Sequence, residues 1–320
     1  MVRIAITVSG MLAALAALQS HAQTYPAKPV RLINAFAPGG ASDVVARSFA
    51  VKLTEYLGRQ VTVENRVGAG GNVAAEHVAR SPADGYTILM GTLFLATNHS
   101  LYSKLSWDTQ RDFAPISMVT ASPLILCVHP SLPARSTKEL IALAKKQPGE
   151  LNFPSAGNGT SMHLSSELFN MMAGIKTLHV PYKGSGPGIL DLVSGRLHFM
   201  LNPMPEPVPF MQAGKLRALA TSTAKRISAL PDLPPVADAV PGFETMTWQG
   251  FVVPAGTPRE IVDRLHAEFV KALKDREFAA RMRGMGLEIY GTTPAEFGQF
   301  IRDENVKWTK VILATGARVD

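Results

Sequence analysis

Apolar and polar positions alternate along the chain in a way that predicts strands and helices in turn. An aliphatic run at 30–33 leads into a glycine turn at 38–40. In the segment that follows, 44–57, apolar side chains recur every three or four residues and so fall on one helical face. A second strand, glycine loop and helix follow within 61–80. This order predicts an α/β fold in which helices flank mixed sheets.

Two long apolar segments indicate how the chain divides. Segments 118–128 and 248–254 both predict strands that cross between two lobes, with a second set of strand and helix patterns between them. We therefore expect a discontinuous first lobe, 23–123 and 248–320, and a second lobe, 124–247. The other predicted strands are 86–90, 151–153, 178–184 (strand and turn), 197–201 and 215–220, and the other predicted helices are 73–80, 140–146, 162–173, 185–194, 259–274 and 294–313.

Length and charge narrow the class of protein. At 320 residues the chain exceeds the size at which one core keeps growing, which favours two lobes. Hydrophobic residues make up 46% and charged residues 18%, an ordinary globular composition. The net charge of +7 is spread over single and paired basic residues without a basic run, which argues against nucleic-acid binding. Cys127 lies in an apolar run and is predicted to be a buried, inert thiol.

Residues 1–22 have the three parts of a secretory signal peptide. Arg3 supplies the positive charge, 5–18 is mostly apolar, and Ser20-His21-Ala22 is a cleavage site with small residues. Cleavage after Ala22 would release a soluble protein into the periplasm. No cysteine follows the cut, so a lipid anchor at the new N-terminus is not expected.

The glycine turn before the first long helix is a candidate anion site. Gly39 and Gly40 let the backbone approach a ligand closely, because no Cβ obstructs it. Ser42 is predicted to cap the helix, whose first N–H groups can bind an anion without a basic side chain. Asp43 is interpreted as a first-turn acid that pairs with Arg47. The alternative is that the turn only connects strand and helix.

Two further features lie where a ligand could bind. Thr92 follows the strand at 86–90, at the end where open α/β sheets bind ligands, although its hydroxyl could equally serve the local backbone. The glycine- and hydroxyl-rich loop 155–161 precedes a helix and would be the second lobe's counterpart of the first turn. His163 lies within a turn of this loop, where a structural histidine is favoured over a ligand contact.

Motifs for catalysis, metal binding and nucleotide binding are absent from the sequence. The chain lacks the Gly-x-Ser-x-Gly elbow of hydrolases and the phosphate loop of nucleotide hydrolases. Its histidines and single cysteine do not have metal-ligand spacing. Gly68-x-Gly70 lacks the last glycine of the dinucleotide motif. We therefore predict a protein without cofactor, metal or catalytic residues.

Short motifs occur in order along almost the whole mature chain: Tyr25-Pro26, Lys28-Pro29-Val30, Pro38-Gly39-Gly40 with Asp43 and Arg47, Glu64-Asn65-Arg66, Gly70-Gly71, Asp84-Gly85-Tyr86-Thr87, Asp112-Phe113-Ala114-Pro115-Ile116, His179-Val180-Pro181-Tyr182-Lys183-Gly184 and Pro254-Ala255-Gly256-Thr257-Pro258. Together they resemble the extracytoplasmic solute receptors of tripartite tricarboxylate transporters, the Bug family. The resemblance implies a two-lobed periplasmic binding protein of the type II, Venus-flytrap kind. Such a protein closes on a small organic carboxylate and delivers it to a membrane permease, and we expect it to be a monomer.

The resemblance also implies which residues contact the ligand. In the first lobe these are Phe36, Pro38, Gly39, Gly40, Ser42, Asp43, Gly70, Gly71 and Thr92. In the second lobe they are Ser155, Asn158, Gly159, Thr160, Ser161, Tyr182 and Lys183, to which the sequence adds His163. Because these loops hold many N–H donors and few cations, we expect main-chain N–H groups and hydroxyls to hold the carboxylate. Segment 202–207 is richer in proline than in similar proteins, so ligand identity does not carry over safely if this segment faces the cleft.

Two other functions stay open from the sequence. An exported hydrolase or transferase could use the same cleft, although the sequence names no nucleophile, base and orienting group. A receptor that docks on a membrane sensor protein would close on its ligand in the same way as one that serves a permease.

Overall fold

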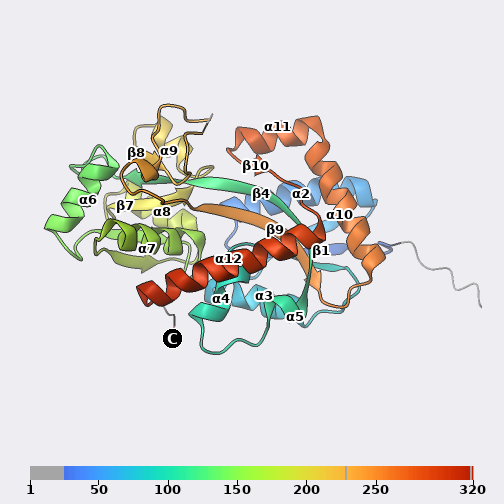
Figure 1. Cartoon of the computed structure of the whole chain (residues 1–320). Coiled ribbons are helices and arrows are strands. Elements are labelled where there is room, and N and C mark those ends of the chain that lie inside the picture. The colour runs from blue at the N-terminus through green and yellow to red at the C-terminus, as the bar shows by residue number, and fades with distance from the viewer. Residues whose placement is uncertain (1–24, 228, 318, 320) are drawn as a thin grey trace, which may run out of the picture.

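A mixed sheet forms the centre of the computed structural model, which describes residues 25–227, 229–317 and 319 (Figure 1). The predicted signal peptide, 1–22, lies outside the described residues. The main strand order is β10 (Glu288–Ile289), β4 (Phe113–Val128), β9 (Met246–Pro254), β3 (Thr87–Gly91), β1 (Val30–Asn34) and β2 (Val61–Asn65). Strands β2, β1 and β3 are parallel, whereas β9, β4 and β10 run antiparallel to their neighbours. The predicted α/β fold with mixed sheets is confirmed.

Strand β4 connects two lobes because it changes partners along its length. Up to Pro123 it pairs with β9. From Leu124 onward it pairs with β7 (Phe199–Pro203) and β8 (Arg217–Thr221). Strands β5 (Asn152–Ser155) and β6 (Leu178–Pro181) form a separate parallel pair. The protein is therefore two-lobed, and the predicted lobe boundaries stay a prediction.

Helices cover both faces of the first-lobe sheet. On one face, α2 (Ala41–Leu57), α10 (Arg259–Lys274) and α11 (Arg276–Gly284) surround a buried cluster that includes Phe49 and Phe251. On the other face lie α3 (Asn72–Ala79), α4 (Phe94–Leu101) and α12 (Pro294–Thr315). The short α5 (Thr109–Asp112) leads into β4. Helix α2 starts beyond the carboxyl end of β1, which places its N-terminus near the second lobe.

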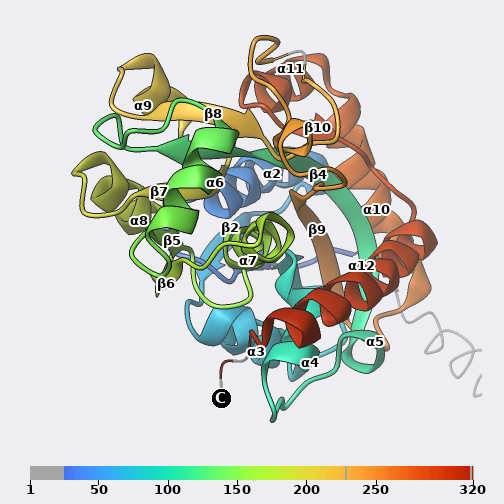
Figure 2. The same ribbon diagram turned by 60° about the vertical axis from the view of Figure 1, so that its left-hand side comes forward.

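The second lobe carries α6 (Thr137–Lys146), α7 (Ser161–Ala173), α8 (Ser185–Val193) and α9 (Val208–Gln212). The long helix α12 lies across the boundary, where it contacts α7 as well as α4 (Figure 2). One buried cluster, which includes Phe94, Phe153 and Trp308, continues from the first lobe into the second. The two lobes therefore share a core on this side of the molecule.

The structure contains helices that the sequence pattern does not reveal. Helix α4 lacks the amphipathic period, because its apolar residues Phe94, Leu95 and Ala96 follow one another and the polar residues Thr97 and Asn98 are buried as well. Helix α11 follows α10 after a single residue, Asp275, whose side chain accepts the N–H of Phe278 and so caps the new helix. The predicted burial of Cys127 is confirmed.

Candidate functional site

A cavity lies between the two lobes, where β1 and β3 end. Its volume is about 630 Å³, including the part that opens to solvent. The residues that line it are Phe36, Ala37, Pro38, Gly40, Ala41, Ser42, Thr92, Ala156, Thr160, Ser161, Met162, Gly184, Ser185, Gly186, Pro187, Pro203, Glu206, Thr247 and Gln249. Because both lobes contribute, a relative movement of the lobes would open or enclose this space.

Three helices begin at the cavity. Gly40 precedes α2, Thr160 precedes α7, and Gly184, whose φ of 143° favours glycine, precedes α8. The first residues of each helix line the cavity. First-turn N–H groups have no acceptor within their own helix and carry partial positive charge. Three such ends around one space provide an anion site built from backbone groups.

The remaining polar groups of the cavity are mostly uncharged. Ser42, Thr92 and Ser161 contribute hydroxyl groups that make no hydrogen bond to other residues within the described part of the chain. No lysine, arginine or histidine lines the cavity, and Glu206 is the one ionisable side chain among its described lining residues. An anionic ligand would therefore be held by N–H and O–H donors, without an ion pair to a lining residue.

Glu206 already uses some of these donors. Its Oε1 accepts the N–H of Ala41 (2.8 Å) in the first turn of α2, and the hydroxyl of Ser185 (2.7 Å) at the start of α8. Its Oε2 accepts Nδ2 of the buried Asn202 (3.2 Å). The Glu206 carboxylate thus lies between helices of opposite lobes.

The described residues contain no group of three or more histidine, cysteine, aspartate or glutamate side chains placed to hold a metal ion. Within the same residues, no helix has the combination of length and apolar character needed to cross a membrane.

Sequence and structure comparisons identify the family. A family model described as "Tripartite tricarboxylate transporter family receptor" matches residues 45–317. The chain belongs to this family. Protein BugT of Bordetella pertussis is 36% identical over 301 residues, which cover 93% of this chain and 92% of BugT.

Solved structures agree with this assignment. The structure of R. palustris Rpa4515 with adipate is 38% identical, covers 91% of this chain and 98% of its own, and superposes with a TM-score of 0.88. MatC (Rpa3494) from Rhodopseudomonas palustris with bound malate is 30% identical, covers 90% of this chain and 100% of its own, and has a TM-score of 0.86. The protein is a solute-binding receptor of the tripartite tricarboxylate transporter family, as its motifs implied.

In this receptor, Asp43 and not Ser42 organises the turn before α2. The prediction that Ser42 caps α2 is wrong, because the N-cap is Gly40 and makes no side-chain cap. Asp43 Oδ2 instead accepts the N–H of Gly39 (3.0 Å) and Nε of Arg47 (2.9 Å), so the predicted pairing with Arg47 is confirmed. Burial alone would raise the pKa of Asp43, but these bonds and one from Asn65 outweigh it and lower the pKa.

We expect Asp43→Asn to lower the free energy of unfolding by about 1.5–3 kcal/mol, the contribution of hydrogen bonds to a charged group. The carboxamide keeps the shape of the side chain but loses the charge that faces Arg47, and its NH₂ group cannot accept the Gly39 N–H. Urea unfolding at pH 7 measures the change. The matched control is Asp232→Asn at an exposed position, and equal midpoints for both variants would contradict the assigned role.

The structure divides the expected ligand contacts into two groups. Those that line the cavity are Phe36, Pro38, Gly40, Ser42, Thr92, Thr160 and Ser161. Those that lie outside its lining are Gly39, Asp43, Gly70, Gly71, Ser155, Asn158, Gly159, His163, Tyr182 and Lys183. Ligand contact by these residues stays a prediction.

Several residues of the second group lie where the lobes approach each other beside the main cavity. Gly70, Gly71, Tyr182 and Lys183 line a smaller cavity of about 310 Å³. Gly159 has a φ of 78°, and a Cβ at this position would collide with the side chain of Leu101 on α4. These glycines therefore permit close contact between the loops of the two lobes.

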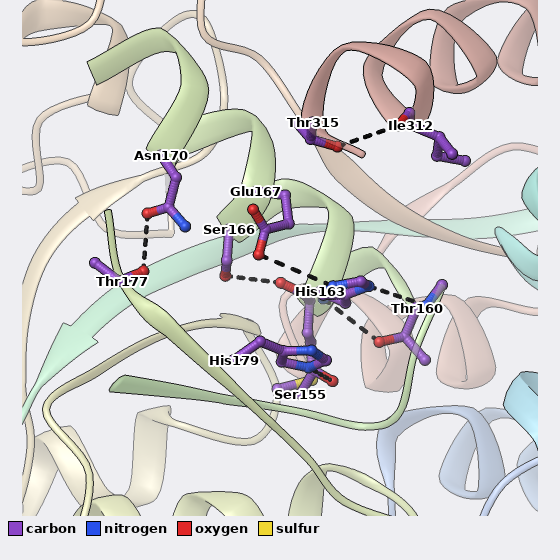
Figure 3. A network of polar contacts seen from close by, with 12 residues as sticks. Ser155, Thr160, His163, Ser166, Glu167, Asn170, Thr177, His179, Ile312 and Thr315 are labelled. Atoms are coloured by element: carbon purple, nitrogen blue, oxygen red, sulfur yellow. Dashed lines mark hydrogen bonds and ion pairs between the residues drawn. The ribbon is translucent and has the colours of Figure 1, made fainter. Parts of the chain in front are cut away.

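The buried His163 and the partly buried His179 form a pair beneath the loop 155–161 (Figure 3). Their rings stack with centroids 4.0 Å apart. His163 Nδ1 accepts the N–H of Gly159 (3.1 Å), and His179 Nε2 lies 2.6 Å from the hydroxyl of Ser155. Burial, and secondarily the neighbouring His179, lowers the pKa of His163 to about 3, while burial lowers the pKa of His179 to about 4. Both rings are neutral near pH 7, and this geometry agrees with the structural role favoured for His163.

Sequence reasoning did not name four polar residues of the cavity: Ser185, Glu206, Thr247 and Gln249. Glu206 comes from the proline-rich segment 202–207, whose unusual composition was a usable signal because that segment does face the cleft. Thr247 and Gln249 lie on β9, where Gln249 Oε1 accepts the hydroxyl of Thr120 (2.8 Å). Nothing in an apolar strand pattern shows which polar side chain will face a cavity.

Proposed function

We propose that this receptor captures a small organic carboxylate in the cavity between its lobes and delivers it to a membrane permease of the transporter. The observation that carries the proposal is the meeting of three helix N-termini at a cavity whose described lining residues include no lysine, arginine or histidine. The relatives with adipate and malate, both organic acids, support a carboxylate as the ligand class.

The same site favours binding over catalysis. Histidine, lysine and cysteine, the common bases and strong nucleophiles, are absent from the described lining of the cavity. The Glu206 carboxylate is occupied by Ala41, Ser185 and Asn202. Neither the exported-enzyme alternative nor the sensor alternative gains support from these contacts. We therefore propose that the ligand is released unchanged.

The proposed place of action is the periplasm. The family is one of transporter receptors, and the N-terminal pattern of 1–22 predicts export with cleavage after Ala22. A monomer suffices for the proposal, because both halves of the cavity come from one chain.

A thermal-shift screen over organic acids, followed by calorimetric titration of the acids that bind, tests the proposal. A ligand at 100 times its Kd should stabilise the protein by about 2.7 kcal/mol. We expect Thr92→Val to weaken binding about tenfold, because the substitution removes one hydroxyl donor and keeps the side-chain shape.

The matched control is Thr62→Val on β2, outside the cavity, which should leave the affinity unchanged. The ligand is recovered after incubation and identified by mass spectrometry. Failure of every acid to shift the unfolding midpoint of ligand-free protein would refute carboxylate binding. Conversion of the ligand into a product would establish the enzyme alternative instead.

A further inference from the structure

Glu206 occupies the position that a ligand carboxylate would take at two of the three helix N-termini. One oxygen, Oε1, accepts from Ala41 of α2 and from Ser185 of α8 at 2.8 and 2.7 Å. These distances are typical of hydrogen bonds to a charged acceptor. Residues 41 and 185 come from opposite lobes, so the bond pattern is that of a carboxylate enclosed in the cleft.

Asn202 holds this carboxylate in place. Its side chain is fully buried, and Nδ2 donates to Glu206 Oε2 at 3.2 Å. The other amide atom, Oδ1, is buried without a hydrogen-bond partner in the described part of the chain. An amide oxygen that is buried without a partner is unfavourable. The hydrogen bond that Nδ2 donates to Glu206 compensates for it and therefore explains why Asn202 keeps this orientation.

The charge of the cavity is therefore negative before any ligand enters. Among the lining residues that the structure describes, no cation offsets Glu206, and its carboxylate accepts from N–H and O–H donors. The N-terminus of α7, which begins at Ser161, is the end that Glu206 does not use. One carboxylate can bind there. A second carboxylate at the other end of the ligand would meet Glu206, and like charges at short distance repel.

The rest of the lining determines what the ligand body should be. Phe36, Pro38, Met162, Pro187 and Pro203 present apolar surface to the cavity. Such surface favours an apolar body and gives a charged group no compensation for lost water. The preferred ligand thus combines one carboxylate with an apolar, uncharged remainder.

We propose that Glu206 is a specificity-determining residue, a built-in carboxylate that makes this receptor select monocarboxylates with an apolar body and reject dicarboxylates. The inference rests on the proposed carboxylate binding and names the class of carboxylate. It distinguishes the chain from relatives solved with adipate and malate, each of which has two carboxyl groups.

The test uses two pairs of probes of equal length, hexanoate with adipate and 4-methylbenzoate with terephthalate, titrated calorimetrically into ligand-free full-length mature protein. For the wild type, we expect the monocarboxylate of at least one pair to bind at least tenfold more tightly than its dicarboxylate. Glu206→Gln keeps the side-chain shape and removes the charge. It should tighten dicarboxylate binding at least tenfold and change monocarboxylate binding by less than threefold.

Glu244→Gln is the control, since it removes the same charge from an exposed position outside the cavity and should leave all four affinities unchanged. Glu206→Ser, which also removes the charge, replaces Glu206→Gln if the latter does not fold, as judged by circular dichroism. Equal binding of both members of each pair by the wild type overturns the inference and leaves carboxylate binding intact. An unchanged ratio of monocarboxylate to dicarboxylate affinity in the Glu206 variants also overturns the inference and leaves carboxylate binding intact. Failure of wild type and variants to bind any probe overturns both proposals.

Discussion

Unfolding of this receptor should become markedly easier as the pH falls from 6.5 towards 4, because the stacked pair His163 and His179 resists protonation in the folded state. An unfolded histidine titrates near 6.5, whereas the folded pKa values of His163 and His179 are lowered to about 3 and about 4. Between these values the unfolded chain binds more protons than the folded one. Each histidine then costs up to about 1.4 kcal/mol of stability per pH unit of acidification.

The histidines set the direction of this pH dependence, and one neighbouring group, Glu167, opposes it. The contribution is complete above pH 6.5, is lost as the pH falls through the window, and stops changing below the folded pKa values. His77 and His198, whose pKa values burial also lowers, act in the same direction. Burial raises the pKa of Glu167, which lies 4.0 Å from His163, so its protonation on folding partly offsets the loss. Asp43 has a lowered pKa, so its stabilisation is complete above its ordinary value of 3.8 and is lost only as the pH falls below that value.

Urea unfolding at a series of pH values from 7.5 to 5 measures the slope. In this range the carboxylates with lowered pKa values contribute little, so the slope reports the histidines together with the opposing effect of Glu167. His179→Asn should flatten it by up to about 1.4 kcal/mol per pH unit, because the variant removes one titrating group. His129→Asn is the control, since His129 is only partly buried and lies outside the pair. A slope that neither variant changes would show that the pair His163 and His179 does not govern acid stability.

Phe49→Ala should have the largest effect of any single truncation considered for the first lobe, a loss of about 3–5 kcal/mol. The Phe49 ring is completely buried. Its centroid lies 5.4 Å from that of Phe251, 5.4 Å from Phe269 and 4.9 Å from Phe278, so removal of the ring leaves a cavity at the centre of an aromatic cluster. Val51→Ala on the same helix is the control, because Val51 is 69% exposed and its truncation should change stability by no more than about 0.5 kcal/mol.

The two variants also separate stability from binding. Position 49 lies eight residues beyond the first residue of α2, about 12 Å along the helix axis, so the N-terminal N–H groups keep their place in the folded variant. Calorimetric titration of a carboxylate ligand into Phe49→Ala, at a temperature below the unfolding midpoint of the variant, should therefore give the wild-type affinity. Loss of affinity in folded Phe49→Ala would show that the core of the first lobe positions the binding turn more directly than these contacts indicate.

The sequence by itself determined the elements that bury one face against the sheet. Helix α10 occupies 259–274, as predicted, because one apolar stripe at helical spacing must pack inward. The glycine turns before α2 and α7 were also predictable, since Gly39 and Gly159 adopt positive φ values that other residues avoid. Motifs that persist along the chain identified the family before any coordinates were needed.

Only the tertiary structure decided which groups form the site. Ala41 and Glu206 are 165 residues apart, and no local pattern shows that the carboxylate of one reaches the N–H of the other. Ser42 was misassigned as the cap because a contact from a distant segment was not visible in the sequence. Asp43 secures the turn in its place, held by Arg47 on the same helix and by Asn65 on the neighbouring strand β2. Helices and strands place apolar residues at a regular spacing that can be read from the sequence. A binding site instead consists of single contacts between residues that are far apart in the sequence. Those contacts exist only after the lobes have packed.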